Sequence, residues 1–419
     1  MNSHKKYISM KKLLNNRISH LLLLSMMLIM TMMTSCNNDD VSGGAPVITE
    51  VRNYEAAPND TIVNKLVPGQ WVVLKGSNLK NAVKIAFNGI AVDFNGGIFS
   101  DNYSVVQVPS VIAFPSIPED QLNTIEVVTP NGSTIFNIDI VAGAPELTSI
   151  SNENPTEGEV VTIFGTNLFL VNEVVFSGTT ITDYELSDTG TAISFVMPNI
   201  VTSGSVSITT ASGTVSTAFN VNSATTEGFL NFDGIGSFSW GTGLSDSSTD
   251  FPGNHGNYAV LNNPVLNAGD GTWWGWERSI NTNAGQWIPE TDLNLNLDQF
   301  AVKFEINVPG NWNGTSILIL KDYNWDFVAR YEPWKISATK TANYTTDGKW
   351  MTVTIPLNEF RGKKDNIDGT GDPASSLTEL LGNSGNGSML IYTTNSGSTP
   401  TATAFRGAID NIRIVKIKE

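Results

Sequence analysis

An internal repeat constrains the fold of this chain more than any other feature of its sequence. The segments VPGQWVVLKGSNLKNAVKIAFNG (67–89) and TEGEVVTIFGTNLFLVNEVVFSG (156–178) each place a second glycine seven positions after the first, then Ser/Thr-Asn-Leu, and a third glycine 13 positions after the second. An Ala-Pro pair precedes each copy, and a segment with a turn glycine closes it. Apolar and polar residues alternate between these turns, as in strands with one buried face. The repeat therefore predicts two small β-sandwiches, over 45–142 and 143–222.

Residues 223–419 differ from the repeats in composition, because they hold nine of the ten tryptophans, all except Trp71. Alternating segments such as FAVKFEINV (300–308) and GAIDNIRIVKI (407–417) are separated by long loops rich in Gly, Asn and Asp. Only 376–382 has the pattern of a helical turn. The segment is predicted to be one larger β-sandwich or jelly roll, which makes the whole chain all-β.

The N-terminus has the pattern of an export signal. Basic residues precede an apolar run from Leu21 to Met33, which is shorter than the roughly 20 residues of a spanning helix and typical of a signal-peptide core. The only cysteine, Cys36, follows this run. The arrangement resembles a bacterial lipoprotein signal, which implies cleavage of residues 1–35 and acylation of Cys36. Residues 36–44 would then be a flexible acidic tether to the outer membrane, with the protein exposed at the cell surface.

The charge of the chain excludes several classes of ligand. Its formal net charge is −16, and loss of the signal removes five basic residues and no acids, which gives −21. A chain this acidic without a basic cluster is not expected to bind nucleic acid. Strongly anionic polysaccharides are poor candidates for the same reason.

The sequence gives little support to an enzyme. His4 and His20 would leave with the signal, so His255 alone cannot build a multi-histidine metal site. No nucleophile elbow or phosphate-binding loop is present. Glycoside hydrolysis needs only two carboxylates, but no acid lies in an apolar strand, the setting expected to raise a catalytic pKa. We therefore predict a protein that is not an enzyme and needs no cofactor.

An acidic loop, DNIDGTGD (365–372), gives weak candidates for a structural calcium site. Carboxylate oxygens are the ligands that calcium prefers. The candidates are Asp365, Asp368 and Asp372, with Asp410 near the last strand. The alternative interpretation is that 365–372 is a solvated loop and that Asp410 lies at a capped strand end.

The tryptophans of the C-terminal segment favour carbohydrate binding. An indole face matches the apolar C–H face of a pyranose ring. Several rings stand among Gly, Asn or Pro residues, where we expect them to be exposed. Trp276, Trp287 and Trp325 are the first choices for sugar contact, and the other candidates are Trp273, Trp274, Trp312, Tyr323 and Trp334. At least one of Trp273, Trp274 and Trp276 should pack instead, Trp350 should be core, and Trp240 is undecided.

The repeats resemble the IPT/TIG immunoglobulin-like domain, most specifically at their GSNL and GTNL segments. The stretches GKWMTVTIPLNEF (348–360) and ARYEPWK (329–335), behind two such domains and a lipoprotein signal, resemble Bacteroidetes surface glycan-binding proteins of polysaccharide-utilisation loci. The more specific resemblance is to the group with a C-terminal xyloglucan-binding domain. It implies capture of polymer beside a SusC/SusD-like transporter and neighbouring surface glycanases.

The sequence therefore predicts a monomer with two rigid spacers and a distal domain that binds a neutral β-glycan. The expected ligand is a β-glucan (xyloglucan, mixed-linkage or β-1,3-linked) or a β-mannan. Two alternatives remain: a glycoside hydrolase with paired carboxylates in the C-terminal domain, and an adhesin that binds protein through its immunoglobulin-like repeats.

Overall fold

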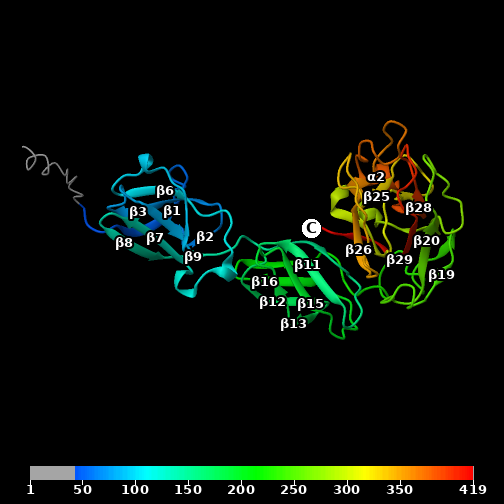
Figure 1. Ribbon diagram of the computed structural model, residues 1–419, viewed down its shortest axis with the longest axis horizontal. Coiled ribbons are helices and arrows are strands. Elements are labelled where there is room, and N and C mark those ends of the chain that lie inside the picture. The colour runs from blue at the N-terminus through cyan, green and yellow to red at the C-terminus, as the bar shows by residue number, and fades with distance from the viewer. Residues whose placement is uncertain (1–42, 419) are drawn as a thin grey trace, which may run out of the picture. The chain divides into compact units, whose positions relative to one another are not determined.

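The computed structural model describes residues 43–418. The predicted signal peptide, Cys36 and most of the tether lie outside the described residues. The described residues divide into two compact units, the first made of those up to Ser110 and Glu119–Ile140, the second of Val111–Pro118 and those from Val141 onward. Figure 1 shows that the elements are almost all strands, so the predicted all-β fold class is confirmed. No helix in the described range has the length and hydrophobicity to cross a membrane.

The first unit is an immunoglobulin-like sandwich of two antiparallel sheets. One sheet has the order β1 (Val47–Asn53), β3 (Trp71–Ser77), β6 (Tyr103–Gln107), and the other β5 (Ile90–Ala91), β4 (Lys84–Phe87), β7 (Thr124–Thr129), β8 (Gly132–Asn137). A short parallel pair joins β2 (Lys65–Leu66) to β9 (Asp139–Ile140). Its 3-10 turns are η1 (Gly96–Ile98) and η3 (Glu119–Gln121). A third 3-10 turn, η2 (Phe114–Ser116), lies between them in the sequence but belongs to the second unit.

The second copy of the repeat forms a similar sandwich inside the second unit. Its sheets are β10 (Glu146–Ile150), β11 (Val160–Thr166), β15 (Ala192–Val196), β14 (Glu185–Leu186), and β13 (Thr179–Ile181), β12 (Val171–Phe176), β16 (Val206–Thr210), β17 (Gly213–Ser216). Its core contains Val161, Ile163, Val174, Phe176 and Ile208.

Glycine is required at the repeated positions for two different physical reasons. Gly69 and Gly158 turn with φ of 78° and 85°, which favours glycine. The middle glycines lie in strands instead. A Cβ on Gly76 would lie 1.7 Å from the carbonyl oxygen of Val47, and one on Gly165 would lie 2.1 Å from that of Glu146. The close approach of the neighbouring strand therefore explains why both copies keep this glycine.

The C-terminal domain is a larger sandwich of two five-stranded antiparallel sheets. The first, called here the ring-bearing sheet, has the order β18 (Phe238–Trp240), β21 (Ser279–Thr282), β28 (Met389–Thr394), β24 (Ser316–Lys321), β25 (Ala329–Tyr331). The second has the order β19 (Leu244–Ser245), β20 (Tyr258–Asn263), β29 (Phe405–Lys416), β23 (Phe300–Asn307), β26 (Met351–Pro356). Their inner faces share one core that includes Phe304, Ile317, Ile319, Ile355 and Ile391.

Short elements close the ends of this sandwich. They are the pair β22 (Gly285–Gln286) and β27 (Asn386–Gly387), the helix α2 (Leu377–Leu381), and the 3-10 turns η4 (Glu290–Asp292), η5 (Leu297–Gln299) and η6 (Leu357–Glu359). The helical turn predicted at 376–382 is confirmed. Ser376 caps it by accepting a hydrogen bond from the Glu379 amide at 3.1 Å.

A buried ion-pair network, called here the joint, connects the second immunoglobulin-like sandwich to the C-terminal domain. Glu153, after β10, contacts the Lys303 Nζ at 2.5 Å and an Arg413 guanidinium nitrogen at 2.7 Å. Arg413 also contacts Glu305 at 2.8 Å, and all four side chains are at most 4% exposed. The Thr352 hydroxyl donates to Glu305 and accepts from the Glu153 amide. Each of these buried charges has an oppositely charged partner, and removal of one partner from such a network leaves an uncompensated buried charge.

Two acids in this region overturn one expectation from the sequence. Glu305 on β23 and Asp410 on β29 are each only 2% exposed, so acids do lie within the apolar strands. The Arg413 guanidinium pairs with Glu305 at 2.8 Å. Burial, with weaker repulsion from Glu305 and Asp233, raises the pKa of Asp410 to about 9, so its carboxyl is protonated at neutral pH.

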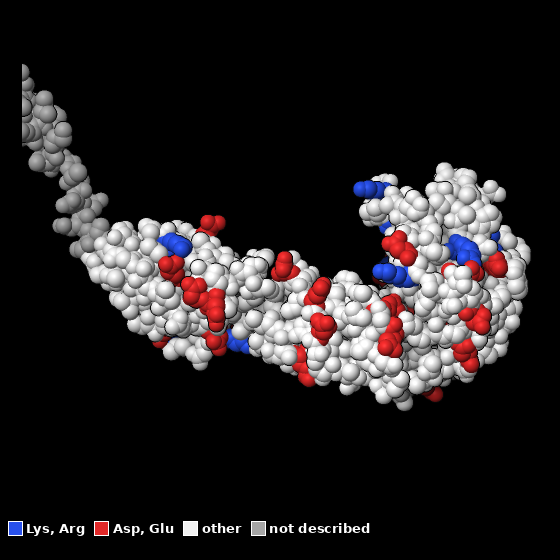
Figure 2. Space-filling view, turned by 60° about the horizontal axis from the view of Figure 1, so that its bottom comes forward, with Lys and Arg blue, Asp and Glu red and all other residues white. Residues whose placement is uncertain are grey.

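The surface reflects the acidic composition. Figure 2 shows acidic side chains scattered over the described part of the chain, and no broad basic patch on the face in view.

Candidate functional site

The ring-bearing sheet is apolar on both faces. Side chains alternate along a strand, so Ile317 and Ile319 of β24 enter the core between the sheets while Leu318 and Leu320 point away from it. The outward residues form a second apolar cluster with Val328, Leu390 and Tyr392, and this cluster is covered by Trp273 and Trp325. A sheet with an apolar outer face needs such a cover, and aromatic rings provide it here.

Five rings gather over this outer face: Trp240, Trp273, Trp274, Tyr323 and Trp325, called here the aromatic face. Trp273 lies at the centre, with ring centroids 5.7 Å from Trp240, 6.0 Å from Trp274, 5.6 Å from Tyr323 and 5.9 Å from Trp325. Trp274 is 63% exposed, Trp240 39% and Tyr323 36%. Trp273 and Trp325 are half-buried. The arrangement presents indole and phenol surface to solvent on a packed base.

A hydrogen bond fixes one of these rings to the sheet. The Trp325 Nε1 donates to the Tyr392 hydroxyl at 3.2 Å. Burial raises the pKa of Tyr392, so the hydroxyl stays protonated at neutral pH. Trp325 is therefore positioned by the sheet below it and not only by its loop.

A row of polar side chains continues the same outer face beyond the rings. Arg330 of β25 lies opposite Leu318 in the register and donates to Glu332 at 2.6 Å and to the Ser396 hydroxyl at 2.9 Å. Glu332 also accepts from the Ser316 hydroxyl at 2.5 Å. Although burial acts in the opposite direction, the hydrogen bond and charge of Arg330 hold the pKa of Glu332 below its usual range. Glu332 also pairs with the Lys335 Nζ at 3.1 Å, so this row presents polar groups that are fixed by ion pairs and hydrogen bonds.

The structure brings four of the predicted rings together: Trp273, Trp274, Tyr323 and Trp325. Trp273 is the half-buried member, which confirms that at least one ring of the Trp273–Trp276 segment packs. Trp276 is 70% exposed and lies beside Gly243, with its ring 3.5 Å from where a Cβ would be. Trp240, left undecided by the sequence, joins the aromatic face, and Trp350, at 5% exposed, is core as predicted.

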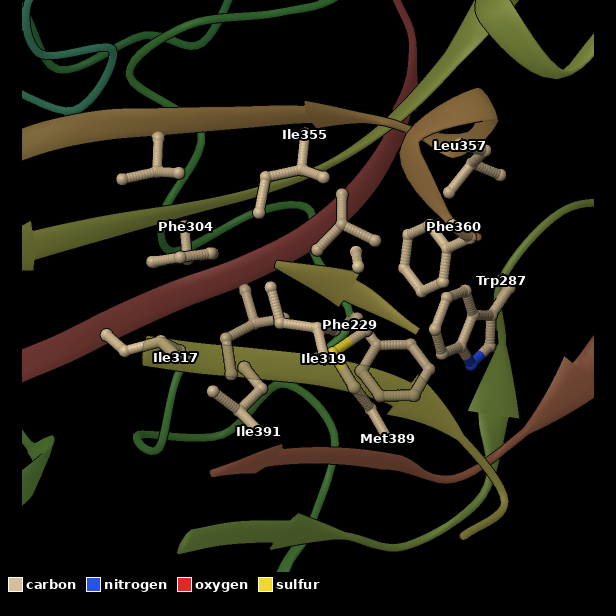
Figure 3. Packing of buried hydrophobic residues seen from close by; sticks show 14 of the residues in the cluster. Phe229, Trp287, Phe304, Ile317, Ile319, Ile355, Leu357, Phe360, Met389 and Ile391 are labelled. Carbon is tan, nitrogen blue, oxygen red and sulfur yellow. The ribbon is translucent and has the colours of Figure 1, made fainter. Parts of the chain in front are cut away.

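The expectation of exposure is wrong for two of the candidate rings. Trp287 is 3% exposed and packs edge-on against Phe229 and Phe360 at 6.1 and 6.0 Å (Figure 3). Trp312 is fully buried, 4.7 Å from Phe405. Their ring nitrogens donate to backbone carbonyls in the interior, which allows an indole to be buried at low cost. Neither presents a face to a ligand in this structure.

Trp334 has an intermediate position. It is half-buried against the main core, and its Nε1 donates to the Thr315 carbonyl oxygen at 2.7 Å. The carbonyl of Thr315 also accepts from the Trp312 ring. Trp334 therefore packs beside the buried Trp312 and outside the aromatic face.

The calcium candidates do not come together as a site. Among the described residues, no group of three or more His, Cys, Asp or Glu side chains is arranged to hold a metal ion. Asp410 is buried on β29, and Asp368 pairs with the Lys363 Nζ at 2.9 Å. Asp365 and Asp372 are exposed in the acidic loop.

Comparisons with known proteins agree with this arrangement. Residues 222–416 match the family model described as the surface glycan-binding protein B xyloglucan binding domain. An IPT/TIG domain-containing protein from Bacteroides ovatus is 22% identical over 488 residues, covering 91% of this chain and 94% of that protein. The crystal structure of the surface glycan-binding protein PbSGBP-B from Prevotella bryantii has the same fold, with a TM-score of 0.70 at 22% identity over 89% of this chain and 99% of that one. The resemblance expected from the sequence is thus confirmed: residues 222–416 match the xyloglucan-binding domain model, and most of the chain is similar to an IPT/TIG domain-containing protein and to a surface glycan-binding protein.

Proposed function

We propose that this protein is a non-catalytic surface glycan-binding protein that holds a neutral β-glucan on the aromatic face. The observation that carries the proposal is the gathering of five rings around Trp273 on the outer face of one sheet. Rings with 36–63% exposure offer flat apolar surface, which matches the C–H face of a pyranose.

The neighbouring polar row supports an uncharged polyhydroxylated ligand. Arg330 and Lys335 both pair with Glu332, so these charges are largely engaged within the protein, and the row offers hydrogen bonds to hydroxyl groups. The family model names xyloglucan, which supports a β-glucan such as xyloglucan, a mixed-linkage glucan or a β-1,3-glucan. Lipid anchoring at Cys36 and delivery to a SusC/SusD-like transporter are parts of the same proposal.

The carboxyl groups support binding without hydrolysis. An acid catalyst needs a raised pKa together with access to the substrate. Asp410 has the raised pKa, but it is only 2% exposed and lies on the sheet opposite the aromatic face. Glu332, beside the rings, has its pKa lowered by Arg330 against the effect of burial, so it is ionised and already paired.

Affinity gel electrophoresis with xyloglucan, barley β-glucan, laminarin, glucomannan and alginate tests this proposal. At least one neutral β-glucan should retard the protein, and alginate should not. The double variant Trp273→Ala/Trp274→Ala should lose most of the retardation, whereas Val201→Ala, at a 90% exposed position of the second sandwich, should keep it. Release of reducing sugar by the purified protein would show that it is a hydrolase instead.

A further inference from the structure

The first immunoglobulin-like domain has an exposed aromatic pair of its own. Tyr54, directly after β1, and Trp71, the first residue of β3, have ring centroids 6.2 Å apart with planes tilted by 45°. They are 59% and 49% exposed. The Tyr54 amide donates to the Trp71 carbonyl oxygen at 3.2 Å. The end of the sheet therefore holds the two residues side by side.

The second copy of the repeat shows that the sandwich does not need these rings. Trp71 stands two positions after the first repeat glycine, where the second copy has Val160, which is also exposed, at 57%. Tyr54 stands nine positions after Ala45, where the second copy has Glu153, a residue of the joint. Leaving an indole and a phenol in water has no benefit for the core, so their presence points to a ligand.

The groups around the pair favour an uncharged ligand. Arg52, on the same face of β1, pairs with Glu50 at 2.8 Å and with Asp60 at 3.3 Å, so the nearby charges neutralise one another. Gln107 lies opposite Trp71 in the register and provides an amide beside the ring. Aromatic surface edged by amide and paired polar groups suits a sugar better than an ion.

We propose that Tyr54 and Trp71 form a second carbohydrate site, which takes one or two consecutive uncharged pyranose rings of the polysaccharide held by the aromatic face. The inference rests on the proposed function, because that function provides the class of ligand. A polymer presents many equivalent segments, so two sites on one chain hold it more tightly than either site does alone. A short oligosaccharide occupies one site at a time and gains nothing from the second.

The test compares polymer and oligosaccharide binding by the full mature chain. Trp71→Val copies the residue of the second repeat, so the sandwich should keep its fold and melting temperature. Tyr54→Ala is the second variant. Ile135→Ala is the matched control, because Ile135 is an exposed apolar residue, at 63%, on the other sheet of the same domain. The probes are xyloglucan and barley β-glucan as polymers, and a xyloglucan heptasaccharide and a mixed-linkage tetrasaccharide as short ligands.

We expect Trp71→Val and Tyr54→Ala each to weaken retention by the polymer at least about tenfold, because linking two sites can raise avidity by roughly 10²- to 10⁴-fold, and to leave oligosaccharide affinity unchanged. In a chain that also carries Trp273→Ala and Trp274→Ala, the weak remaining polymer retention should disappear with Trp71→Val. Polymer retention equal to that of Ile135→Ala would overturn this inference alone. A wild-type chain that binds none of the neutral polymers would overturn the proposed function as well.

Discussion

Individual tryptophans of the C-terminal domain have opposite environments although their sequence contexts are similar. Trp274 lies between Trp273 and Gly275 and is 63% exposed, whereas Trp287 follows Gly285 and Gln286 and is 3% exposed. The difference comes from their neighbours in space. Trp274 lies on other rings over the outer face of a sheet, whereas Trp287 follows β22, which pairs with β27 and closes the end of the core.

Substitution of these two indoles should separate binding from stability. Trp274→Ala should weaken glucan affinity by roughly thirtyfold, or about 2 kcal/mol, the scale of an aromatic hot spot, without changing the unfolding midpoint. Trp287→Phe should destabilise the fold by about 1–3 kcal/mol, because it leaves a cavity and removes the hydrogen bond to Gly387. Isothermal titration calorimetry and urea unfolding measure the two effects. Equal affinity loss in both variants would contradict the assignment of Trp274 to the site.

The raised pKa of Asp410 predicts that the stability of the fold depends on pH, and a single substitution should remove this dependence. Its folded pKa is about 9, against an ordinary value of 3.8, so the folded state binds one more proton than the unfolded state between these values. Stability should therefore fall as pH rises from about 4 to about 9. Asp410→Asn keeps an acceptor for the Asn411 amide and avoids the charge.

The Asn variant should accordingly be more stable than the wild type at pH 8, by more than about 1 kcal/mol, and the two should converge near pH 4. Urea unfolding at both pH values provides the measurement. Asp246→Asn provides a comparison on an exposed aspartate of the same domain. An Asn variant that is less stable at pH 8 would show that Asp410 is ionised in the folded protein.

At the scale of the elements, the joint fixes the second sandwich to the C-terminal domain. Removing Glu153 leaves Lys303 and Arg413 buried with only Glu305 nearby. Uncompensated buried charge is destabilising by about 3–5 kcal/mol. Glu153→Ala should therefore lower stability by about this amount and separate the unfolding of the two domains into two transitions.

Differential scanning calorimetry of the mature chain would detect these transitions. Glu185→Ala is the control, because Glu185 is exposed on β14 of the same sandwich. A single transition with an unchanged midpoint in Glu153→Ala would show that the joint does not couple the two domains. Glucan affinity should be unchanged, since the joint involves the sheet opposite the aromatic face.

Local patterns predicted the repeats, their glycines and the strand alternation, because each of these depends on neighbours in the chain. The aromatic face depends on sheet order instead. Trp240 of β18, Tyr392 of β28 and Trp325 after β24 meet only because the ring-bearing sheet pairs β18 with β21 and β28 with β24. No local sequence pattern predicts that pairing. The sequence alone therefore does not decide whether Trp240 packs or contacts sugar, and it does not identify Tyr392 as a residue of the site.

The acids show the same limitation. Glu305 and Asp410 follow strand alternation to faces that other parts of the chain cover: Glu305 meets Arg413 and the joint, and Asp410 is buried nearby. The sequence pattern could not show that the outer face of this sheet would be covered by another domain.

For the whole molecule, charge and proposed ligand together predict how binding depends on salt. The chain carries a formal net charge of −16, while the aromatic face and the Tyr54–Trp71 pair present rings and internally paired ions. Contacts of this kind are dispersion and hydrogen bonding, which salt screens little, whereas screening of a charged ligand is strong at a Debye length of about 10 Å in 0.1 M salt. Retention by a neutral β-glucan should therefore stay within about twofold between 0.05 and 0.5 M NaCl. Affinity gels run across this range of salt measure the retention, with alginate as the polyanionic comparison. A steep loss of β-glucan retention with salt would mean that ion pairing holds the ligand. The aromatic face would then be the wrong site.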